Sequence, residues 1–504
     1  MENFKDQEGL SNILPYDFVK ENDVLAFSDG DSFSVISPNN LSDDIYHEIQ
    51  RFLKSNFSFS LCKSDYFNDL LTSSFSINKD STLLSEELTD EFDLQSFAGS
   101  ISATEDLLSG SNDTPIIKLI NGIISQAVKN RASDIHFEPY EDTLIVRFRV
   151  DGILKEILKQ DSKISSVLIS RIKIISGLDI SERRLPQDGR VSLSLGDKDI
   201  DVRVSTLPSS YGERIVLRLL DKQASQINID DLGLPSVILK NYKSSLKNSE
   251  GIILFTGPTG SGKTTTLYSG LRYLSDSSQN ILTVEDPIEY AIEGIGQTQV
   301  NTKVDMTFAR GLRAILRQDP DVVMIGEIRD LETAEMATQA ALTGHLVLST
   351  LHTNDAPSAI TRLMELGIPP YLIRATVIGV MAQRLVRTLC EECKTPIDIQ
   401  EEDWKMLTRP WSTPLPKQAH QPVGCLACRN TGYRGRAGVY EIMPLSENLK
   451  EYINEQGQLT DLRKNAIKEG MHSLRLSGAN KIAKGQTTIE EVLRVTPSSL
   501  NSKS

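Results

Sequence analysis

The feature that most constrains the fold is a short glycine-rich segment between an apolar run and a helical pattern. Residues 252–256 form the apolar run Ile-Ile-Leu-Phe-Thr, and residues 257–264 that follow are GPTGSGKT. The segment matches G-x-x-x-x-G-K-[ST] at every fixed position, and Leu267, Leu271 and Leu274 then recur at helical spacing. A strand, a glycine loop and a helix in this order form a phosphate-binding loop. The sequence therefore predicts a nucleoside triphosphate site.

Each residue type in this loop has an expected task. The glycines carry no Cβ, so backbone NH groups can face phosphate oxygens. Lys263 is expected to reach the β- and γ-phosphates of ATP, and Thr264 to offer its hydroxyl to Mg²⁺. An ordinary glycine-rich turn is the alternative, which the flanking strand and helix disfavour. The expected nucleotide-binding residues are Gly257, Pro258, Thr259, Gly260, Ser261, Gly262, Lys263, Thr264 and Thr265.

Three further apolar runs continue the pattern of strand followed by helix. They occupy residues 280–284, 321–325 and 346–350. Short buried strands that alternate with helices indicate a parallel sheet covered by helices. Ligands of such sheets bind where the strands end. Because each run is followed by polar residues, we expect one site at that edge.

Two acids and two histidines stand next to these strands. Glu285 closes one strand, and we expect it to polarise the attacking water. Gly326 takes the usual acidic position at another strand, so Glu327 is expected to serve the Mg²⁺ shell through water. A helix cap or a surface position is the alternative for each acid. His352 is expected to sense the γ-phosphate, whereas His345 fits that role and the role of a cation closing a helix equally well.

Four of the five cysteines form two Cys-x-x-Cys pairs. They are Cys390 with Cys393 and Cys425 with Cys428, and the pairs are separated by 31 residues. Two such pairs supply the four thiolates of a structural Zn²⁺ site. A redox pair or free buried thiols are the alternatives. Cys62 stands alone and is expected to be a small, semi-apolar side chain.

The first part of the chain has a different pattern. A helix is expected from Thr114, after which apolar and polar residues alternate strictly in several runs, as in an antiparallel sheet with one solvated face. Earlier, residues 23–27 and 33–36 predict short strands and 45–53 a helix. The alternating runs are 144–150, 191–195, 199–205 and 215–219.

These changes of pattern predict six segments. Residues 73–112 are rich in Ser, Asp, Glu and Thr without a strong period, which is typical of a flexible linker. The expected order is a small domain at 1–72, the linker at 73–112, an α+β domain at 113–225, a hinge at 226–240, a nucleotide-binding domain at 241–495 that contains a cysteine module at 388–432, and a disordered tail at 496–504.

The net charge of −14 is concentrated at the front of the chain. Residues 1–112 hold 21 acidic and 6 basic residues. An acidic segment repels nucleic acid and favours a partner with basic patches. The longest apolar candidate, residues 371–386, is interrupted by Arg374, Gln383 and Arg384, short of the roughly 18 apolar residues of a membrane span. The start, MENFKDQEGL, lacks the pattern of a secretory signal, so a cytoplasmic location is expected.

The motifs together resemble the secretion/type IV pilus ATPase family. GPTGSGKTTTLY, ILTVEDPIEY, RQDPDVVMIGEIRD and TGHLVLSTLHTNDA carry the resemblance, and CEEC with CLACRNTGYRGRAGVYEI resembles its assembly-type members. SDIHFEP, RFRVDG and RLPQDGR match as well. The likeness covers residues 113–495. The short front end favours type II secretion ATPases over pilus assembly ATPases.

The resemblance implies a fold and an activity. It implies an α/β protein with a RecA-like P-loop ATPase domain, a preceding α+β (PAS-like) domain, a small N-terminal α/β domain and a four-cysteine zinc subdomain. The implied function is a cytoplasmic motor that hydrolyses ATP to drive pseudopilus assembly and protein export through a type II secretion system. A type IV pilus assembly ATPase is the alternative. A nucleic-acid translocase and a non-hydrolysing scaffold fit less well.

The resemblance also implies further site residues and partners. Arg203 and Arg218 match arginines that approach the phosphates, and Arg362 and Arg434 match arginines linked to subunit contacts and turnover. The implied assembly is a homo-hexamer that binds no nucleic acid. Residues 1–72 are expected to bind the cytoplasmic domain of an inner-membrane type II secretion protein, and the motor to act on an inner-membrane platform protein. ATP, Mg²⁺ and Zn²⁺ are the implied cofactors, and the location is peripheral to the inner membrane.

Overall fold

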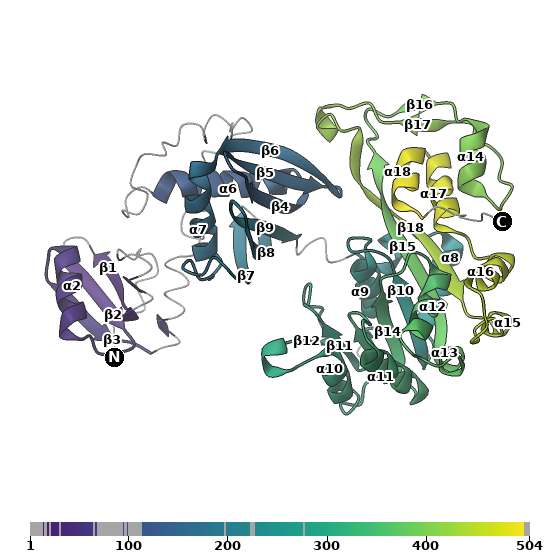
Figure 1. Ribbon diagram of the computed structural model, residues 1–504, viewed down its shortest axis with the longest axis horizontal. Coiled ribbons are helices and arrows are strands. Elements are labelled where there is room, and N and C mark those ends of the chain that lie inside the picture. The colour runs from purple at the N-terminus through teal and green to yellow at the C-terminus, as the bar shows by residue number, and fades with distance from the viewer. Residues whose placement is uncertain are drawn as a thin grey trace. The chain divides into compact units, whose positions relative to one another are not determined.

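The computed structural model describes most of the chain as two compact units, Met1–Lys222 and Gln223–Ser504 (Figure 1). Most of the predicted linker, 73–112, and residues 498–504 of the predicted tail lie outside the described residues. The structure describes residues 14, 18–19, 22–29, 32–63, 66–67, 94, 98, 113–195, 198–221, 227–275 and 278–497.

The second unit is built on a seven-stranded sheet with the order β12-β11-β13-β14-β10-β15-β18. Its first six strands run parallel, which confirms the predicted parallel sheet, and β18 is antiparallel at one edge. The strands are β10 (Gly251–Thr256), β11 (Ile281–Glu285), β12 (Gly296–Gln299), β13 (Val322–Ile325), β14 (Leu346–Leu351), β15 (Val377–Leu389) and β18 (Tyr433–Pro444).

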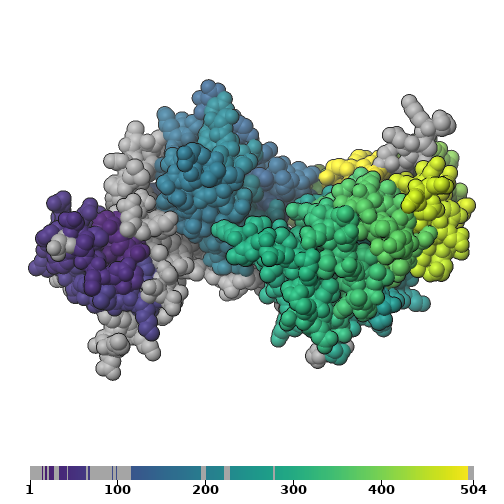
Figure 2. Space-filling model, turned by 60° about the horizontal axis from the view of Figure 1, so that its bottom comes forward, coloured from purple at the N-terminus to yellow at the C-terminus, as the bar shows by residue number. Residues whose placement is uncertain are grey.

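Helices cover both faces of this sheet, because alternate residues of its strands point to opposite cores. Ile252 and Leu254 of β10 belong to one core, with residues of α11 and α12. Ile253 and Phe255 belong to the other, with residues of α8 and α9. The helices named here are α8 (Ser236–Leu246), α9 (Lys263–Leu274), α11 (Leu331–Leu342) and α12 (Ala356–Glu365). In Figure 2 the green and yellow segments form most of the visible surface of this unit.

The remaining elements of the second unit are short. Within the described part of the predicted hinge, a 3-10 turn is followed by the start of α8. The elements are η4 (Ile229–Leu232), η5 (Thr302–Val304), α10 (Phe308–Ile315), α13 (Pro370–Thr376), β16 (Thr395–Ile397), α14 (Glu401–Thr408), β17 (Ala419–Gln421), η6 (Leu426–Cys428), α15 (Glu447–Lys450), α16 (Leu459–Lys468), α17 (Leu474–Ala483) and α18 (Ile489–Val495).

The first unit contains a six-stranded antiparallel sheet with the order β6-β5-β4-β9-β8-β7. One face packs on α6 and α7, which bury residues such as Ile120 and Ile172 against Phe137 and Phe148. The other face carries the polar members of the predicted alternation. The elements are α6 (Asp113–Lys129), β4 (Ala132–Pro139), β5 (Thr143–Val150), β6 (Ile153–Asp161), η2 (Ser162–Ile164), α7 (Ser165–Ile175), β7 (Gln187–Leu195), β8 (Lys198–Ser209) and β9 (Gly212–Asp221).

The front of the chain forms a smaller layer of sheet and helix. Strands β1 (Leu25–Asp29), β2 (Ser32–Ser37) and β3 (Phe57–Leu61) pair in that order, and α2 (Asp43–Leu53) packs on them through Ile49 and Leu53. Across the described residues of the whole chain, no helix is long and apolar enough to cross a membrane.

Candidate functional site

The phosphate loop joins the buried central strand β10 to helix α9. Its geometry requires glycine at two positions. Gly257 and Gly262 have φ angles of +151° and +90°, in the range that L side chains rarely adopt. A Cβ at Gly257 would lie 2.6 Å from the carbonyl oxygen of Gln383, and one at Gly262 would lie 2.7 Å from the Nε2 atom of Gln383. The loop therefore lies directly against β15.

The groups that would meet phosphate are preorganised in this loop. Lys263 Nζ donates to the carbonyl oxygens of Gly257 at 2.6 Å and Pro258 at 3.2 Å. Burial, with Arg384 nearby, lowers the pKa of Lys263 to about 8 although Glu327 acts in the opposite direction. The buried hydroxyl of Ser261 has no hydrogen-bond partner among the described residues, and no side chain caps the N-terminus of α9. The Ser261 hydroxyl and the uncapped NH groups at the start of α9 are therefore donors that a polyphosphate could accept from.

Glu327 and His352 meet at the same edge of the sheet. Glu327 follows β13 and His352 follows β14, and His352 Nε2 lies 3.3 Å from Glu327 Oε2. Arg329 contacts the other carboxylate oxygen of Glu327. Burial and the charge of Lys263 lower the pKa of His352, so Lys263, Glu327 and His352 share one electrostatic environment. The structure brings these three predicted residues together.

Glu285 is held differently. Its side chain is buried and accepts hydrogen bonds from Thr283 Oγ1 at 2.6 Å and Gln297 Nε2 at 3.0 Å. Tyr268 of α9 donates to its second carboxylate oxygen. Both acids have both carboxylate oxygens in contact with other side chains, but Glu285 is buried whereas the side chain of Glu327 is 13% exposed, so Glu327 is the more accessible of the two to a water molecule. Its predicted role in polarising water is not favoured by this geometry.

Three other predicted residues lie away from the phosphate loop. His345 precedes β14, whose first residue pairs with Gly251, the first residue of β10. His345 therefore lies at the amino ends of the strands, whereas the phosphate loop lies at their carboxyl ends. Its Nδ1 donates to the carbonyl oxygen of Ala340 at 2.9 Å, after the end of α11. This contact fits the alternative role of closing a helix, and the predicted part of His345 in nucleotide binding stays a prediction. Arg362 pairs with Glu365 on α12, and Arg434 lies 3.8 Å from the carboxylate of Glu392.

The two arginines predicted to approach phosphate lie in the first unit. Arg203 of β8 and Arg218 of β9 are direct partners in the sheet register. Arg218 Nε donates to Asp134 Oδ1 at 3.0 Å. Their predicted role therefore stays a prediction.

Two residues of β15 that lie against the loop were not among the predicted site residues. Gln383 accepts a hydrogen bond from Thr266 Oγ1 at 2.7 Å, and Arg384 is buried beside it. The available signal was that both residues interrupt the apolar run at 371–386. A charged side chain in a buried strand is energetically costly unless a nearby group binds it, so the arginine in this run indicates a local binding partner.

The four cysteines of the two pairs form a second cluster. Their sulfur atoms all lie within 4.8 Å of one another, with Cys390–Cys425 at 3.9 Å and Cys393–Cys428 at 3.8 Å. Zinc–sulfur bonds of about 2.3 Å in a tetrahedron place sulfur atoms about 3.8 Å apart. Burial acts to raise the pKa of Cys428. The hydrogen bonds that its sulfur accepts from the backbone NH groups of Cys425 and Gly432 outweigh this effect, and the pKa is lowered to about 6. The donor set fits Zn²⁺.

Comparisons with known proteins match nearly the whole chain. The family model described as Type II/IV secretion system protein matches residues 109–494. Type II secretion system protein E of Pseudomonas aeruginosa is 48% identical over 484 residues, 96% of each chain. Type II secretion system ATPase E of Vibrio cholerae is 50% identical over 463 residues, 91% of each chain. The structure of the pilus retraction motor PilT with bound ADP is similar with a TM-score of 0.51 and 26% identity, over 75% of this chain and 97% of that one.

Proposed function

The chain belongs to the type II/IV secretion system protein family. We propose that it is an ATPase that drives protein export through a type II secretion system. The observation that carries the proposal is the meeting of Lys263, Glu327 and His352 at the strand ends beside a complete phosphate loop. Such a site binds a triphosphate and places an acid and a polar sensor next to it.

The residues of the site have separable tasks. Lys263 and the NH groups of the loop neutralise the phosphates, and the hydroxyl of Ser261 gains an acceptor. Thr264 and Glu327 offer hydroxyl and carboxylate oxygens, the ligands that Mg²⁺ prefers. Mg²⁺, when bound, would neutralise charge on the phosphates. Glu327 is also the acid best placed to accept a hydrogen bond from the attacking water, and His352 orients Glu327 through their 3.3 Å contact.

A steady-state ATPase assay tests this proposal. Lys263→Ala removes the cation that faces the phosphates, so turnover should fall at least about a hundredfold. Lys247→Ala removes an exposed lysine at the end of α8 and is the matched control. Equal ATPase activity of wild type and Lys263→Ala would contradict the proposal. Hydrolysis that DNA stimulates and salt suppresses would instead favour the nucleic-acid translocase.

Type IV pilus assembly is the second candidate. The similarity to a pilus motor supports it, whereas the relatives that match 91–96% of this chain are type II secretion proteins. Complementation separates the two. The chain should restore export of secreted enzymes in a strain that lacks its own type II secretion ATPase, and should not restore pili in a strain that lacks a pilus ATPase.

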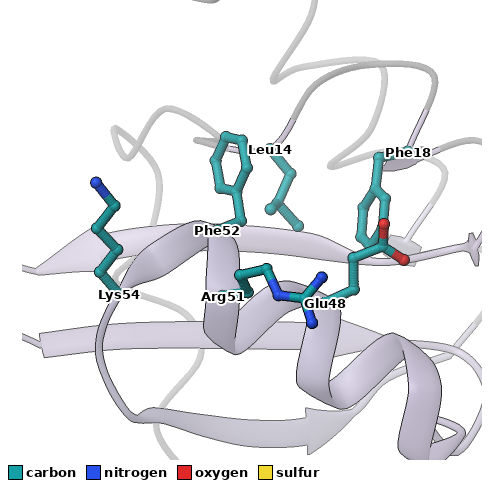
Figure 3. A pocket seen from close by; sticks show the side chains of 6 residues that line it. All are labelled: Leu14, Phe18, Glu48, Arg51, Phe52 and Lys54. Atoms are coloured by element: carbon teal, nitrogen blue, oxygen red, sulfur yellow. The ribbon is translucent and has the colours of Figure 1, made fainter.

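We assign docking on the inner-membrane partner to residues 1–72. A groove of about 500 Å³ lies beside α2 in this segment. Figure 3 shows Phe18 and Phe52 standing on either side of Leu14, with Glu48, Arg51 and Lys54 at its rim. Phe52 is 51% exposed. An apolar floor with charges around it is the usual composition of a protein interface.

The remaining assignments complete the proposed motor. Homo-hexamers are proposed as the active assembly, bound peripherally to the inner membrane through partners, with a platform protein as the recipient of the work. Arg203 and Arg218 are proposed to neutralise phosphate charge, as arginines do in other nucleotidases. Arg362 and Arg434 are proposed to act in subunit contacts and in turnover. Zn²⁺ at the four cysteines is proposed to be structural, because no ligand position is left open.

A further inference from the structure

A buried arginine lies beneath the phosphate loop and has no part in the roles assigned above. Arg384 is 4% exposed. It lies on β15 two residues after Ala382, which pairs with the last residue of β10. A Cβ atom at Gly257 would lie 2.9 Å from Arg384 Nη1. The guanidinium group therefore packs directly against the first residue of the loop.

The guanidinium group is held only by neutral acceptors in the part of the chain that the structure describes. Nη1 donates to the carbonyl oxygen of Gln383 at 2.9 Å, and Nη2 donates to the carbonyl oxygen of Asn354 at 2.8 Å. The side-chain oxygen of Asn354 is a weaker acceptor at 3.5 Å. None of the described carboxylates forms an ion pair with Arg384. A buried charge without a counterion is costly.

The two acids that influence Arg384 from a distance bind other donors. Glu441 accepts the NH groups of Ala356 at 2.7 Å and Leu474 at 3.3 Å, which begin α12 and α17. Asp355 lies 2.6 Å from Arg463. Neither carboxylate is free to compensate Arg384 fully, so its positive charge adds to that of Lys263 around the loop.

We propose that Arg384 is a positioning residue of this site, an inference that rests on the proposed ATPase function. The bound phosphates would supply the counterion that Arg384 lacks among the described residues. Arg384 acts through the loop and need not touch the nucleotide. Its charge favours the polyanion. Its guanidinium group packs against Gly257 and donates a hydrogen bond to the carbonyl oxygen of Asn354, which lies two residues after His352. Occupancy of the loop is thereby linked to the segment that carries the sensor.

Two variants separate the charge from the fork of hydrogen bonds. Arg384→Gln removes the charge, so the dissociation constants of ATP and ADP should rise about ten- to a hundredfold. Arg384→Lys keeps the charge but cannot hold both carbonyl groups in one rigid fork. We expect its dissociation constants within about threefold of wild type and its kcat about tenfold lower. Arg374→Gln is the matched control, because Arg374 also donates to a carbonyl oxygen, that of Ile453.

The measurements are nucleotide affinity by calorimetry and kcat, both on the full chain, with the thermal midpoint as a check of folding. Wild-type affinity in Arg384→Gln would overturn the inference, as would equal losses of affinity in Arg384→Gln and Arg384→Lys, because packing alone predicts equal losses. If Arg384→Gln does not fold, a folded Arg384→Lys that loses affinity more than tenfold overturns it. A wild type that binds ATP without hydrolysing it contradicts the proposed function instead, because affinity is measured independently of turnover.

Discussion

The ammonium group of Lys263 is buried in the loop, and this determines how the site responds to pH. Its pKa of about 8 lies below the ordinary value of 10.5, so the free protein loses this proton as pH rises through 8. Bound phosphates favour the charged form, so binding takes up a proton above that pH. The apparent affinity for ATP should therefore be constant below pH 7 and fall up to about tenfold per pH unit above 8.

Calorimetry in two buffers of different ionisation enthalpy measures this proton uptake directly. The observed enthalpy of ATP binding should depend on the buffer at pH 8.5 and much less at pH 6.5. Lys247→Ala should behave like wild type. An affinity that stays constant to pH 9.5 would show that the Lys263 proton is held as firmly in the free protein as in the complex.

The two acids of the site should respond differently to the same isosteric change. Glu327→Gln removes the carboxylate that contacts His352, and we expect turnover to fall at least about a hundredfold while ATP still binds. Glu285→Gln alters a buried network with Tyr268, Thr283 and Gln297. We expect its main cost in stability, about 1–3 kcal/mol.

Turnover at saturating ATP and urea unfolding distinguish these outcomes. A loss of turnover in Glu285→Gln as large as in Glu327→Gln, with unchanged stability, would instead identify Glu285 as the group that polarises water, as the sequence predicts.

At the scale of elements, two strands that pair over their length carry the cysteine module. Cys390 and Cys393 follow β15, and Cys425 and Cys428 precede its antiparallel partner β18. A metal at the four thiolates would join the two ends of the long segment that connects β15 to β18. Purified protein should hold about one equivalent of zinc, and Cys393→Ser or Cys425→Ser should lose it and lower the thermal midpoint.

Mass spectrometric metal analysis of the protein as purified checks this expectation. Cys62→Ser is the matched control, because Cys62 lies on a different part of the chain and should leave the metal content unchanged. Wild-type protein without a bound metal would reject the zinc assignment.

Sequence patterns predicted the elements best where burial follows a simple rule. Strands β10, β11, β13 and β14 are short apolar runs with helices between them, and the alternating runs of the first unit became its antiparallel sheet. The strand β15 was missed, because its 13 residues include Gln383 and Arg384. These two residues lie against the phosphate loop because β15 pairs with β10, a strand more than 100 residues earlier in the chain, and local sequence patterns do not show such a pairing.

The same limit applies to the site. The positions of Glu327 and His352 could be predicted because each comes within two residues of the end of a parallel strand, and that of Lys263 because the glycine loop that carries it follows β10. His345 is only seven residues before His352, but one strand separates them, so it lies at the other edge. A motif that spans a whole strand therefore does not place all of its residues at one site.

At the scale of the whole molecule, partner docking and ATP hydrolysis are assigned to different units of the chain, so they should be separable by mutation. Phe52→Ser changes a half-exposed side chain at the groove beside α2, so the cost in stability should be small. We expect this variant to keep basal ATPase activity, to bind poorly to inner-membrane vesicles that contain the partner, and to lose export. Lys263→Ala should bind the vesicles normally and also lose export.

Co-sedimentation with such vesicles, ATPase activity of the purified protein and export in cells together test this separation. Tyr211→Ser is the matched control, because Tyr211 is similarly exposed at 54% but lies at the turn between β8 and β9 and is not one of the residues that line the groove. Vesicle binding that survives Phe52→Ser would place the docking surface elsewhere. Loss of vesicle binding in Lys263→Ala would mean that docking depends on nucleotide, so that the two activities are coupled rather than merely carried by one chain.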